Sequence, residues 1–258
     1  MRSPDELRAL VEAHLADLEL SPALGGLEQV MRYALDGGGK RIRPVLCLAT
    51  AEAAGGDPED ALDAAAAIEL IHSFSLVHDD LPALDDDEER RGRPTVHVRF
   101  GEAQAILAGD ALMVEGFRLT NRYRESELRF EILQATSGMI GGQYLDVDGA
   151  GADRIELNRL KTGRLFEASV GCGLWVAEVP VDGQGPWRAF AADYGLLYQL
   201  VDDLLDDDGL VRERGRQATL ELAVETDRSA RTNLEAIDAD TSVLAELLAE
   251  VSARKEAR

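Results

Sequence analysis

Apolar residues recur along most of the chain at the three- and four-residue spacing that is typical of amphipathic helices. The first such pattern begins at Leu7, after a helix start in which Ser3 can act as N-cap and Glu6 can close a capping box. Asp153 fits a helix N-cap and Gly209 a helix stop. No segment of useful length alternates with period two, so a sheet is not expected. Helices are predicted over residues 25–35, 43–54, 57–77, 101–121, 126–147, 154–177, 188–207, 217–235 and 240–255.

These helices are expected to form one unit. The chain contains no internal repeat and no linker rich in proline, glycine or serine that would separate two domains. Aromatic residues make up only 5% of the chain, whereas alanine, leucine, glutamate and arginine, which favour helices, are abundant. We therefore predict an all-α fold in which residues 1–258 form a single domain, a bundle of about ten helices.

Charge and hydropathy exclude several classes of partner. No apolar run approaches the roughly 18 residues that span a bilayer, and the first twenty residues are charged and amphipathic, so neither a membrane span nor a secretory signal is expected. Cys47 and Cys172 lie in apolar helical patterns without metal-binding spacing, which favours reduced core residues of a cytoplasmic protein. The net charge of −22 argues against nucleic acid or an anionic membrane as partner, because both would repel the protein.

Two runs of acidic residues stand where carboxylates destabilise a helix. Residues 79–89 and residues 202–208 each follow a long apolar helix. A helix C-terminus carries partial negative charge, so each exposed carboxylate there costs about 0.3–1 kcal/mol. Like charges four residues apart, such as Asp202 and Asp206, cost a few tenths of a kcal/mol more. Two such penalties in one chain indicate a compensating cation.

An acidic run can also be ordinary solvated surface of an acidic protein, but three features count against that interpretation. The helices before both runs are too apolar to be surface helices, the two runs have the same geometry, and Arg90, Arg91 and Arg93 follow the first run. Carboxylates beside basic residues suit a metal-bridged polyphosphate, because Mg²⁺ completes its shell with water and phosphate oxygens. Only three of the 27 basic residues are lysines, which marks their positions: Lys40, Lys161 and Lys255.

Five ordered motifs, found between about residue 25 and residue 208, resemble those of the short-chain polyprenyl diphosphate synthases of the farnesyl and geranylgeranyl diphosphate synthase type. A lone aspartate-rich motif would be weak evidence, whereas five in order are strong. The resemblance implies an isoprenoid synthase fold, with helices around a central apolar cavity. The motifs are residues 38–44 (GGKRIRP), 78–95 (HDDLPALDDDEERRGRPT), 141–146 (GGQYLD), 161–163 (KTG) and 198–206 (YQLVDDLLD).

The resemblance also implies a role for individual residues. About three Mg²⁺ ions, bridged by diphosphate, would be present. The helical spacing agrees with a common site for His72 and Asp79, because His72 lies two turns before Asp79 and faces the same way. The implied isopentenyl diphosphate ligands are Lys40, Arg43, His72 and Arg91. The implied allylic diphosphate ligands are Arg90, Lys161 and Gln199, with Thr162 as a further substrate-binding residue. The implied metal ligands are Asp79, Asp85 and Asp202, with Asp80, Asp203 and Asp206 as direct or water-mediated partners. The implied catalytic set is Asp79, Asp85, Arg90, Lys161, Gln199 and Asp202.

The implied reaction is the condensation of isopentenyl diphosphate with an allylic diphosphate in isoprenoid biosynthesis. Phe74, beside the small Ser75, stands five residues before the first aspartate of the motif, and an aromatic residue there resembles a farnesyl limit on product length. The alternatives are ordinary core packing of Phe74, with the cavity floor near Met113 or Phe117, and a geranylgeranyl product. The family is usually homodimeric, so a homodimer is expected.

The segment after the second aspartate motif departs from the family pattern. Residues 207–216 are shorter than usual and lack the first expected lysine; Arg216 is a candidate for the second lysine, and Arg212 or Arg214 for the missing contact. This departure leaves open a non-catalytic subunit of a heteromer. A terpene cyclase or a head-to-head synthase shares the ionisation step, but it has no need to hold isopentenyl diphosphate, so Lys40, Arg43 and Arg91 count against it.

Overall fold

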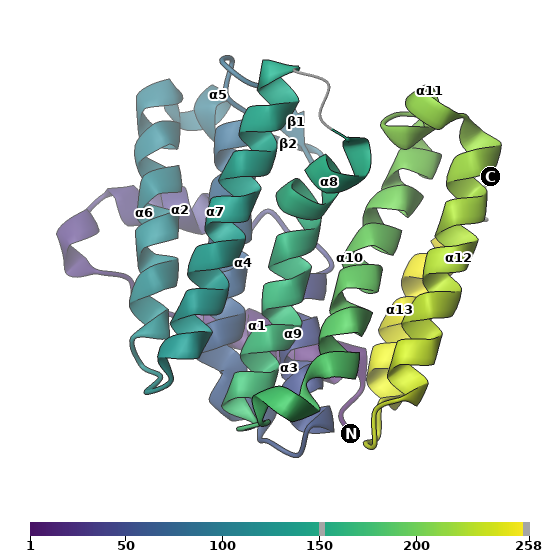
Figure 1. Cartoon of the computed structure of the whole chain (residues 1–258). Helices are drawn as coiled ribbons and strands as arrows, with labels where there is room; N and C mark the ends of the chain where they lie inside the picture. The colour runs from purple at the N-terminus through teal and green to yellow at the C-terminus, as the bar shows by residue number, and fades with distance from the viewer. Residues whose placement is uncertain (150–152, 255–258) are drawn as a thin grey trace.

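The computed structural model describes residues 1–149 and 153–254, and in them the prediction of an all-α bundle is confirmed. Ten of its α-helices, within these described residues, have nine residues or more (Figure 1). They are α1 (Pro4–Asp17), α2 (Leu27–Leu35), α3 (Ile42–Ala53), α4 (Leu62–Asp79), α6 (Glu102–Thr120), α7 (Ser126–Asp148), α9 (Arg164–Val176), α10 (Gly185–Asp206), α12 (Arg216–Glu235) and α13 (Ser242–Arg254). Lys255, the last residue of the predicted helix 240–255, lies outside the described residues.

Shorter elements connect these helices. Some were absent from the sequence-based prediction, which included no separate helix at α5 or α11 and no strand. Strands β1 and β2 form only a two-residue antiparallel hairpin, in which Glu89 faces Pro94 and Arg90 faces Arg93. A single turn of 3-10 helix, Pro58–Ala61, precedes α4, so the α-helix begins five residues later than predicted. The short elements are α5 (Val96–Phe100), α8 (Arg154–Asn158), α11 (Leu210–Arg214), β1 (Glu89–Arg90) and β2 (Arg93–Pro94).

The helix predicted over residues 154–177 is observed as a continuous helical run over residues 154–176, but a π-helical turn, which the sequence did not predict, divides it. The segment forms α8, then a π-helical turn, Arg159–Gly163, and then α9. The turn packs against α7 and α10. A side-chain β-carbon at Gly142 of α7 would lie 2.5 Å from the Lys161 nitrogen, and one at Gly195 of α10 would lie 2.9 Å from the α-carbon of Gly163. Two glycines on the facing helices therefore make room for the wider turn.

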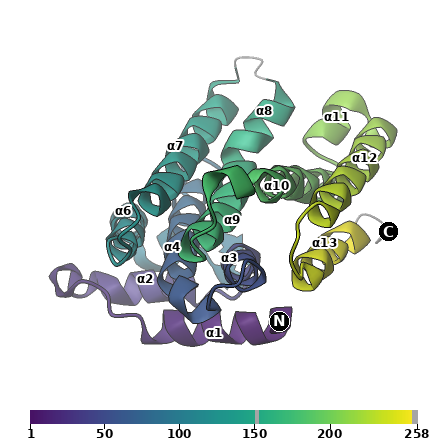
Figure 2. The ribbon, with the colours of Figure 1, turned by 60° about the horizontal axis from the view of Figure 1, so that its bottom comes forward.

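Helix α4 is the centre of the bundle. It is apolar on nearly all sides, as expected for a buried helix, and residues 64–71 are all buried. Figure 2 shows it surrounded by α2, α3, α6 and α9, and α4 contacts all four. Because α4 is fixed on every side, the residues that follow its C-terminal end at Asp79 are held in a defined place.

The side-chain caps predicted from the sequence are present at the starts of α1 and α8. Ser3 caps α1 and forms a capping box with Glu6, as predicted, and the Asp153 carboxylate accepts a hydrogen bond from the Ile155 nitrogen at the start of α8. Cys47 and Cys172 are buried and free. Within residues 1–149 and 153–254 no helix combines the length and the apolar character that a bilayer crossing requires.

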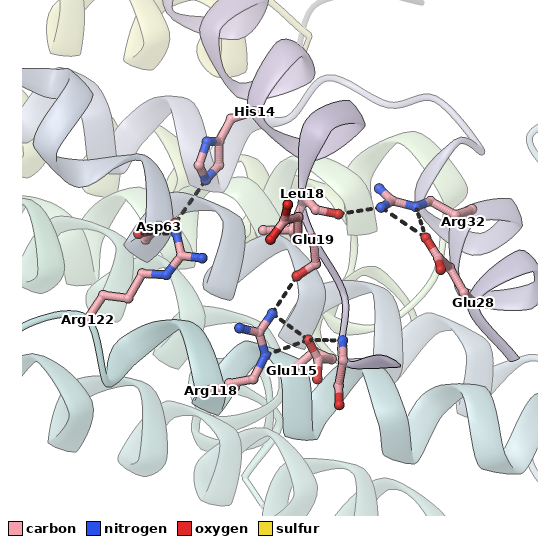
Figure 3. Close-up of polar contacts among 10 residues, drawn as sticks. His14, Leu18, Glu19, Glu28, Arg32, Asp63, Glu115, Arg118 and Arg122 are labelled. Atoms are coloured by element: carbon pink, nitrogen blue, oxygen red, sulfur yellow. Dashed lines mark hydrogen bonds and ion pairs between the residues drawn. The ribbon is translucent and has the colours of Figure 1, made fainter. Parts of the chain in front are cut away.

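Arginines fix the connection between α1 and α2 on the outside of the bundle (Figure 3). The Arg32 guanidinium donates to the carbonyl oxygens of Leu15, at 2.8 Å, and of Leu18, which are left unpaired by the end of α1. Arg118 donates to the Glu19 carbonyl at 2.6 Å and pairs with the buried Glu115 carboxylate. These contacts hold α1 and α2 against α6 and lie away from the acidic motifs.

Candidate active site

Three cavities that share lining residues contain most of the predicted site residues, whereas Asp80 and Arg90 line a separate cavity beside β1 and β2. Helices α4 and α10 both end on the side of the bundle where β1, β2 and α11 lie (Figure 1). The two acidic runs therefore open toward the same end of the molecule. Lys161 and Thr162, in the π-helical turn, line both the cavity beside α4 and the one beside α10.

The cavity beside α4, which we call the apolar cavity, has a volume of about 320 Å³. Its wall includes Phe74, Ser75, Met139 and Leu165, and its polar groups include Asp79. Phe74 is buried and stands edge-on to His78, with ring centroids 5.7 Å apart. Met113 and Phe117, the alternative floor, pack partly buried against the core and are not among the lining residues that the structure describes.

A second cavity, the basic cavity, has a volume of about 220 Å³ and brings together the four predicted isopentenyl diphosphate ligands, Lys40, Arg43, His72 and Arg91. Arg43 and His72 also line the apolar cavity, so the two spaces meet at these residues. Burial and the nearby arginines hold the pKa of His72 well below its usual value, which keeps the imidazole neutral. The Arg43 guanidinium lies 4.2 Å from the Phe166 ring centroid, and its buried Nε has no hydrogen-bond partner.

The loop before α3 is held by a buried ion cluster. Arg41 adopts a left-handed conformation, with φ 47°, and is 6% exposed. Its guanidinium pairs with Glu69 of α4 at 2.5 Å and with Glu12 of α1 at 2.8 Å, and it donates to the Leu35 carbonyl at 2.6 Å. The turn at Arg41 lies between Lys40 and Arg43, and both of these line the basic cavity.

In the first aspartate motif, the three predicted metal ligands differ in surroundings. Asp80 is buried and accepts hydrogen bonds from Arg90 at 2.6–2.7 Å. Burial raises the pKa of Asp79 to about 6; the charges of Asp85 and Asp80 also raise it, while those of Lys161 and Arg90 lower it. Asp85 is exposed, and its backbone nitrogen donates to the Asp79 carbonyl at 2.9 Å, which folds the loop back over the helix end.

The third cavity, the acidic cavity, has a volume of about 300 Å³ and lies beside α10. The Thr162 hydroxyl donates to Gln199 at 2.9 Å, and the Gln199 amide donates to Asp203 at 2.8 Å. The other Asp203 oxygen accepts from the Leu210 nitrogen, so this carboxylate is held on both sides. Burial raises the pKa of Asp202, which pairs with Arg254 at 2.8 Å. The cavity is lined by Asp146, Arg154, Leu157, Asn158, Lys161, Thr162, Gln199, Asp202, Asp203, Asp206, Asp208 and Gly209.

The acidic groups fit a metal that is only partly bound by protein. Within the part of the chain that the structure describes, no three carboxylate, imidazole or thiol groups are grouped to hold a metal by themselves. Asp79 and Asp202 are half-buried, and burial penalises their charged forms. A nearby cation would relieve that penalty. Mg²⁺ suits such a site, because one or two carboxylates and several water or phosphate oxygens complete its shell.

The basic residues proposed to replace the missing lysine lie outside this cavity lining. Arg212 is 72% exposed at its side chain and pairs with Asp208, whereas Arg214 pairs with Asp153. Arg216 donates to the Leu204 carbonyl and to Asp207 at the end of α10. Arg154 of α8 and Arg254 of α13, which contact Asp146 and Asp202, were not predicted from the sequence. Neither stands in a recognisable motif, and only the tertiary fold brings Arg254 to Asp202.

Several known proteins with similar sequences are farnesyl or geranylgeranyl diphosphate synthases. The chain is 42% identical over 191 residues to the geranylgeranyl diphosphate synthase of Cyanophora paradoxa; the match covers 68% of this chain and 64% of that relative. It is 39% identical to the farnesyl diphosphate synthase of Geobacillus stearothermophilus, covering 74% and 69%. The farnesyl diphosphate synthase of Micrococcus luteus is 36% identical, covering 89% of this chain and 82% of the relative. The chain thus spans about two thirds of the first two relatives' length.

Solved structures agree over the whole fold. A crystal structure of a geranylgeranyl pyrophosphate synthase superposes with a TM-score of 0.89 at 25% identity, covering 99% of this chain and all of that chain. The geranyltranstransferase of Thermotoga maritima gives a TM-score of 0.86 at 27% identity, covering 99% of each. Residues 25–223 match the family model described as polyprenyl synthetase, and this match includes all five motifs. The chain belongs to the polyprenyl synthetase family.

Proposed function

We propose that the protein is a Mg²⁺-dependent prenyltransferase that condenses isopentenyl diphosphate with an allylic diphosphate, and that residues 1–258 act as one polyprenyl synthase domain. The observation that carries the proposal is the meeting of the basic cavity with the apolar cavity at Arg43 and His72. Two anionic substrates with hydrocarbon chains could be held there with their reacting carbons close together. The names of the similar proteins, farnesyl and geranylgeranyl diphosphate synthase, agree with this chemistry.

Each group of residues has a task in this reaction. Lys40, Arg43 and Arg91 bind the diphosphate of isopentenyl diphosphate, and the neutral His72 donates or accepts a hydrogen bond there without adding charge. Lys161 orients the allylic diphosphate from the turn between the apolar and acidic cavities. Arg90 pairs with Asp80, which is next to Asp79 in the first aspartate motif. Bound Mg²⁺ would supply positive charge that stabilises the departing diphosphate.

Bond making follows from this arrangement. The allylic C1–O bond breaks, and the diphosphate leaves with the electron pair. The double bond of isopentenyl diphosphate then attacks C1, a carbon–carbon bond forms, and the proton lost from the acceptor goes to the released diphosphate. Phe74, Met139 and Leu165 keep the allylic cation in apolar surroundings, where water cannot capture it.

Phe74 supports a farnesyl product, because this buried aromatic ring is part of the apolar wall and leaves less room than a small side chain. The experiment that tests the proposal is mass-spectrometric product analysis with Mg²⁺, isopentenyl diphosphate and dimethylallyl, geranyl or farnesyl diphosphate in turn. A C15 end product would support the full proposal. A C20 end product would keep the reaction and overturn the Phe74 limit, and no condensation by folded protein would overturn the reaction itself.

Two alternatives are separated by the same assay. A non-catalytic subunit would be inactive alone; both aspartate motifs are intact, which favours the catalytic interpretation. A cyclase would consume an allylic diphosphate without isopentenyl diphosphate. Substituting Lys40 would then leave its activity unchanged, whereas the same substitution would disable a prenyltransferase.

The partner and the compartment belong to the same proposal. Apolar side chains that are roughly half exposed or more lie on the adjacent helices α6 and α7, and a second copy of the chain would cover them. We propose a homodimer through this face. The buried, unpaired cysteines agree with a reducing cytoplasm. The exposed residues are Ile106, Leu107, Val114, Phe130, Leu133, Ile140, Tyr144 and Val147.

A further inference from the structure

We infer that Arg154, the first residue of α8, is an additional ligand of the allylic diphosphate. The inference rests on the proposed function, since it names a further residue of the same substrate site. Arg154 lines the acidic cavity together with Lys161. Among the residues described as lining that cavity, these two are the basic ones.

The two basic side chains are joined through one carboxylate. Lys161 donates to one oxygen of Asp146 at 2.7 Å, and the Arg154 guanidinium lies 3.5 Å from the other oxygen. Asp146 therefore holds both cations on the same wall of the cavity. A diphosphate that reaches Lys161 also comes within the neighbourhood of Arg154.

The ion pair of Arg154 can be exchanged at low cost. Its distance to Asp146 is longer than a hydrogen bond, and the two side chains are 37% and 34% exposed. Surface pairs of this kind contribute between about zero and 1 kcal/mol. An arginine binds phosphate through a planar fork of donors, which makes a diphosphate a stronger partner than this distant carboxylate.

The negative charge of the cavity favours a role for a second basic residue. Its lining contains five aspartates, Asp146, Asp202, Asp203, Asp206 and Asp208, against two basic side chains. The arginines that follow the second aspartate motif contact Asp207, Asp208 and Asp153 and are not part of the described lining. Metal ions would offset the acidic groups, and Arg154 adds a second basic side chain to the described lining of this cavity, beside Lys161.

The test measures binding without turnover. Wild-type protein, Arg154→Gln, Arg154→Lys and Arg159→Gln are titrated with geranyl thiolodiphosphate in Mg²⁺ by isothermal calorimetry, because this analogue does not ionise at its allylic carbon. Arg159 is a matched control: it loses the same charge, is nearby in sequence, and pairs only with Glu156 among its described contacts. Thermal unfolding of each variant confirms that it is folded.

We expect Arg154→Gln to weaken analogue binding about tenfold, the effect of losing one hydrogen bond to a charged group. Arg154→Lys should fall between wild type and Arg154→Gln, because it keeps the charge and loses the fork. Arg159→Gln should remain within about twofold of wild type. The KM for isopentenyl diphosphate should not change in Arg154→Gln, since that substrate is held in the basic cavity.

Two results would overturn the inference, and they differ in meaning. If wild type binds the analogue and Arg154→Gln binds it as Arg159→Gln does, Arg154 is not a ligand and the proposed function stands. If wild type neither binds the analogue nor condenses isopentenyl diphosphate with any allylic substrate, the proposed function itself is wrong and the inference falls with it.

Discussion

Two adjacent glycines in α7 differ completely in their surroundings, although the sequence gives no sign of the difference. A β-carbon at Gly141 would meet nothing within 4 Å, whereas one at Gly142 would lie 2.5 Å from the Lys161 nitrogen and 2.8 Å from its α-carbon. We expect Gly142→Ala to destabilise the protein by about 1–3 kcal/mol through this overpacking. It should also lower kcat/KM, because the turn that carries Lys161 and Thr162 must move.

Gly141→Ala is the matched control for that substitution. An alanine there removes a flexible glycine from a helix interior without a clash, so it should be neutral or stabilise the protein by up to about 1 kcal/mol. Denaturant unfolding of both variants measures the difference. Equal stability of the two would show that the close approach of the π-helical turn to α7 is wrong.

Asp79 should make the metal-free protein less stable as the pH rises. Its pKa is about 6 when folded, against 3.8 as the ordinary value. The folded state therefore binds more protons between about pH 4 and pH 6, and the free energy of unfolding falls with rising pH through that window. Asp79→Asn removes the penalty, so without Mg²⁺ at pH 7 it should be more stable than wild type by about 1–2 kcal/mol, discounted for partial exposure.

Unfolding of wild type and Asp79→Asn at pH 4.5 and pH 7, each with EDTA, measures this contribution. Most of the effect of the raised Asp79 pKa on the free energy of unfolding develops between these two pH values. The advantage of the asparagine variant should shrink at the lower pH. A variant that is no more stable than wild type at pH 7 would contradict the burial of an uncompensated charge, and loss of condensation activity in the same variant would connect that charge to function.

Sequence motifs predicted which motif residues share a cavity, but not the ion pairs that these residues form. Lys40, Arg43, His72 and Arg91 were expected together and do line one cavity. Arg254 was not expected, because 52 residues separate it from Asp202 and its place depends on how α13 packs. Pairing of Asp80 with Arg90 was also missed, since a run of like charges does not say which carboxylate turns inward.

Among the helices, α3 depends on an ion cluster at its start. Glu69 is 5% exposed at its side chain and Glu12 is 47% exposed, although both pair with the buried Arg41. Removing one partner of a buried pair leaves an uncompensated charge, at a cost of about 3–5 kcal/mol. We expect Glu69→Gln to destabilise the protein by about 3 kcal/mol, near the low end because the amide still accepts a hydrogen bond, and Glu12→Gln by less than about 1 kcal/mol.

Chemical denaturation of the two variants tests this difference, with the KM for isopentenyl diphosphate as a second measurement. The turn at Arg41 separates Lys40 from Arg43, so Glu69→Gln should raise that KM more than the KM for the allylic substrate. Similar stability of both variants would mean that Arg41 is solvated rather than held by α4.

The boundaries of α6 could be predicted from local signals, whereas the π-helical interruption between α8 and α9 could not. The pattern over residues 101–121 and the observed α6, Glu102–Thr120, agree closely, because the apolar spacing and the flanking residues act within the segment. The π-helical turn at Arg159–Gly163 leaves the same apolar spacing nearly intact. The residues that make room for it, Gly142 and Gly195, belong to two other helices and lie outside any window around residues 154–177 that would be searched for a helix pattern.

At the scale of the molecule, α6 and α7 lie next to each other at one edge of the bundle (Figure 1, Figure 2), and each carries a strip of exposed apolar residues. Leu107 and Val114 of α6, and Leu133, Ile140 and Val147 of α7, repeat every seven residues and therefore lie on one face of each helix. A partner helix pair could pack along these strips.

Ile140 connects the α7 strip to the active site, because it is 51% exposed and also lines the apolar cavity.

We expect Val114→Glu to convert a dimer into a monomer of 28.0 kDa, because Val114 is 58% exposed on the α6 strip. Light scattering after gel filtration measures the mass. Val181→Glu is the control, since Val181 is 71% exposed on another part of the surface. If the partner subunit covers the side of the cavity at Ile140, the monomeric variant should admit water and release more allylic alcohol relative to condensed product. A wild-type monomer, or a Val114→Glu dimer, would contradict the proposed interface. A monomer with an unchanged product ratio would keep the interface and show that the partner subunit is not needed to exclude water from the cavity.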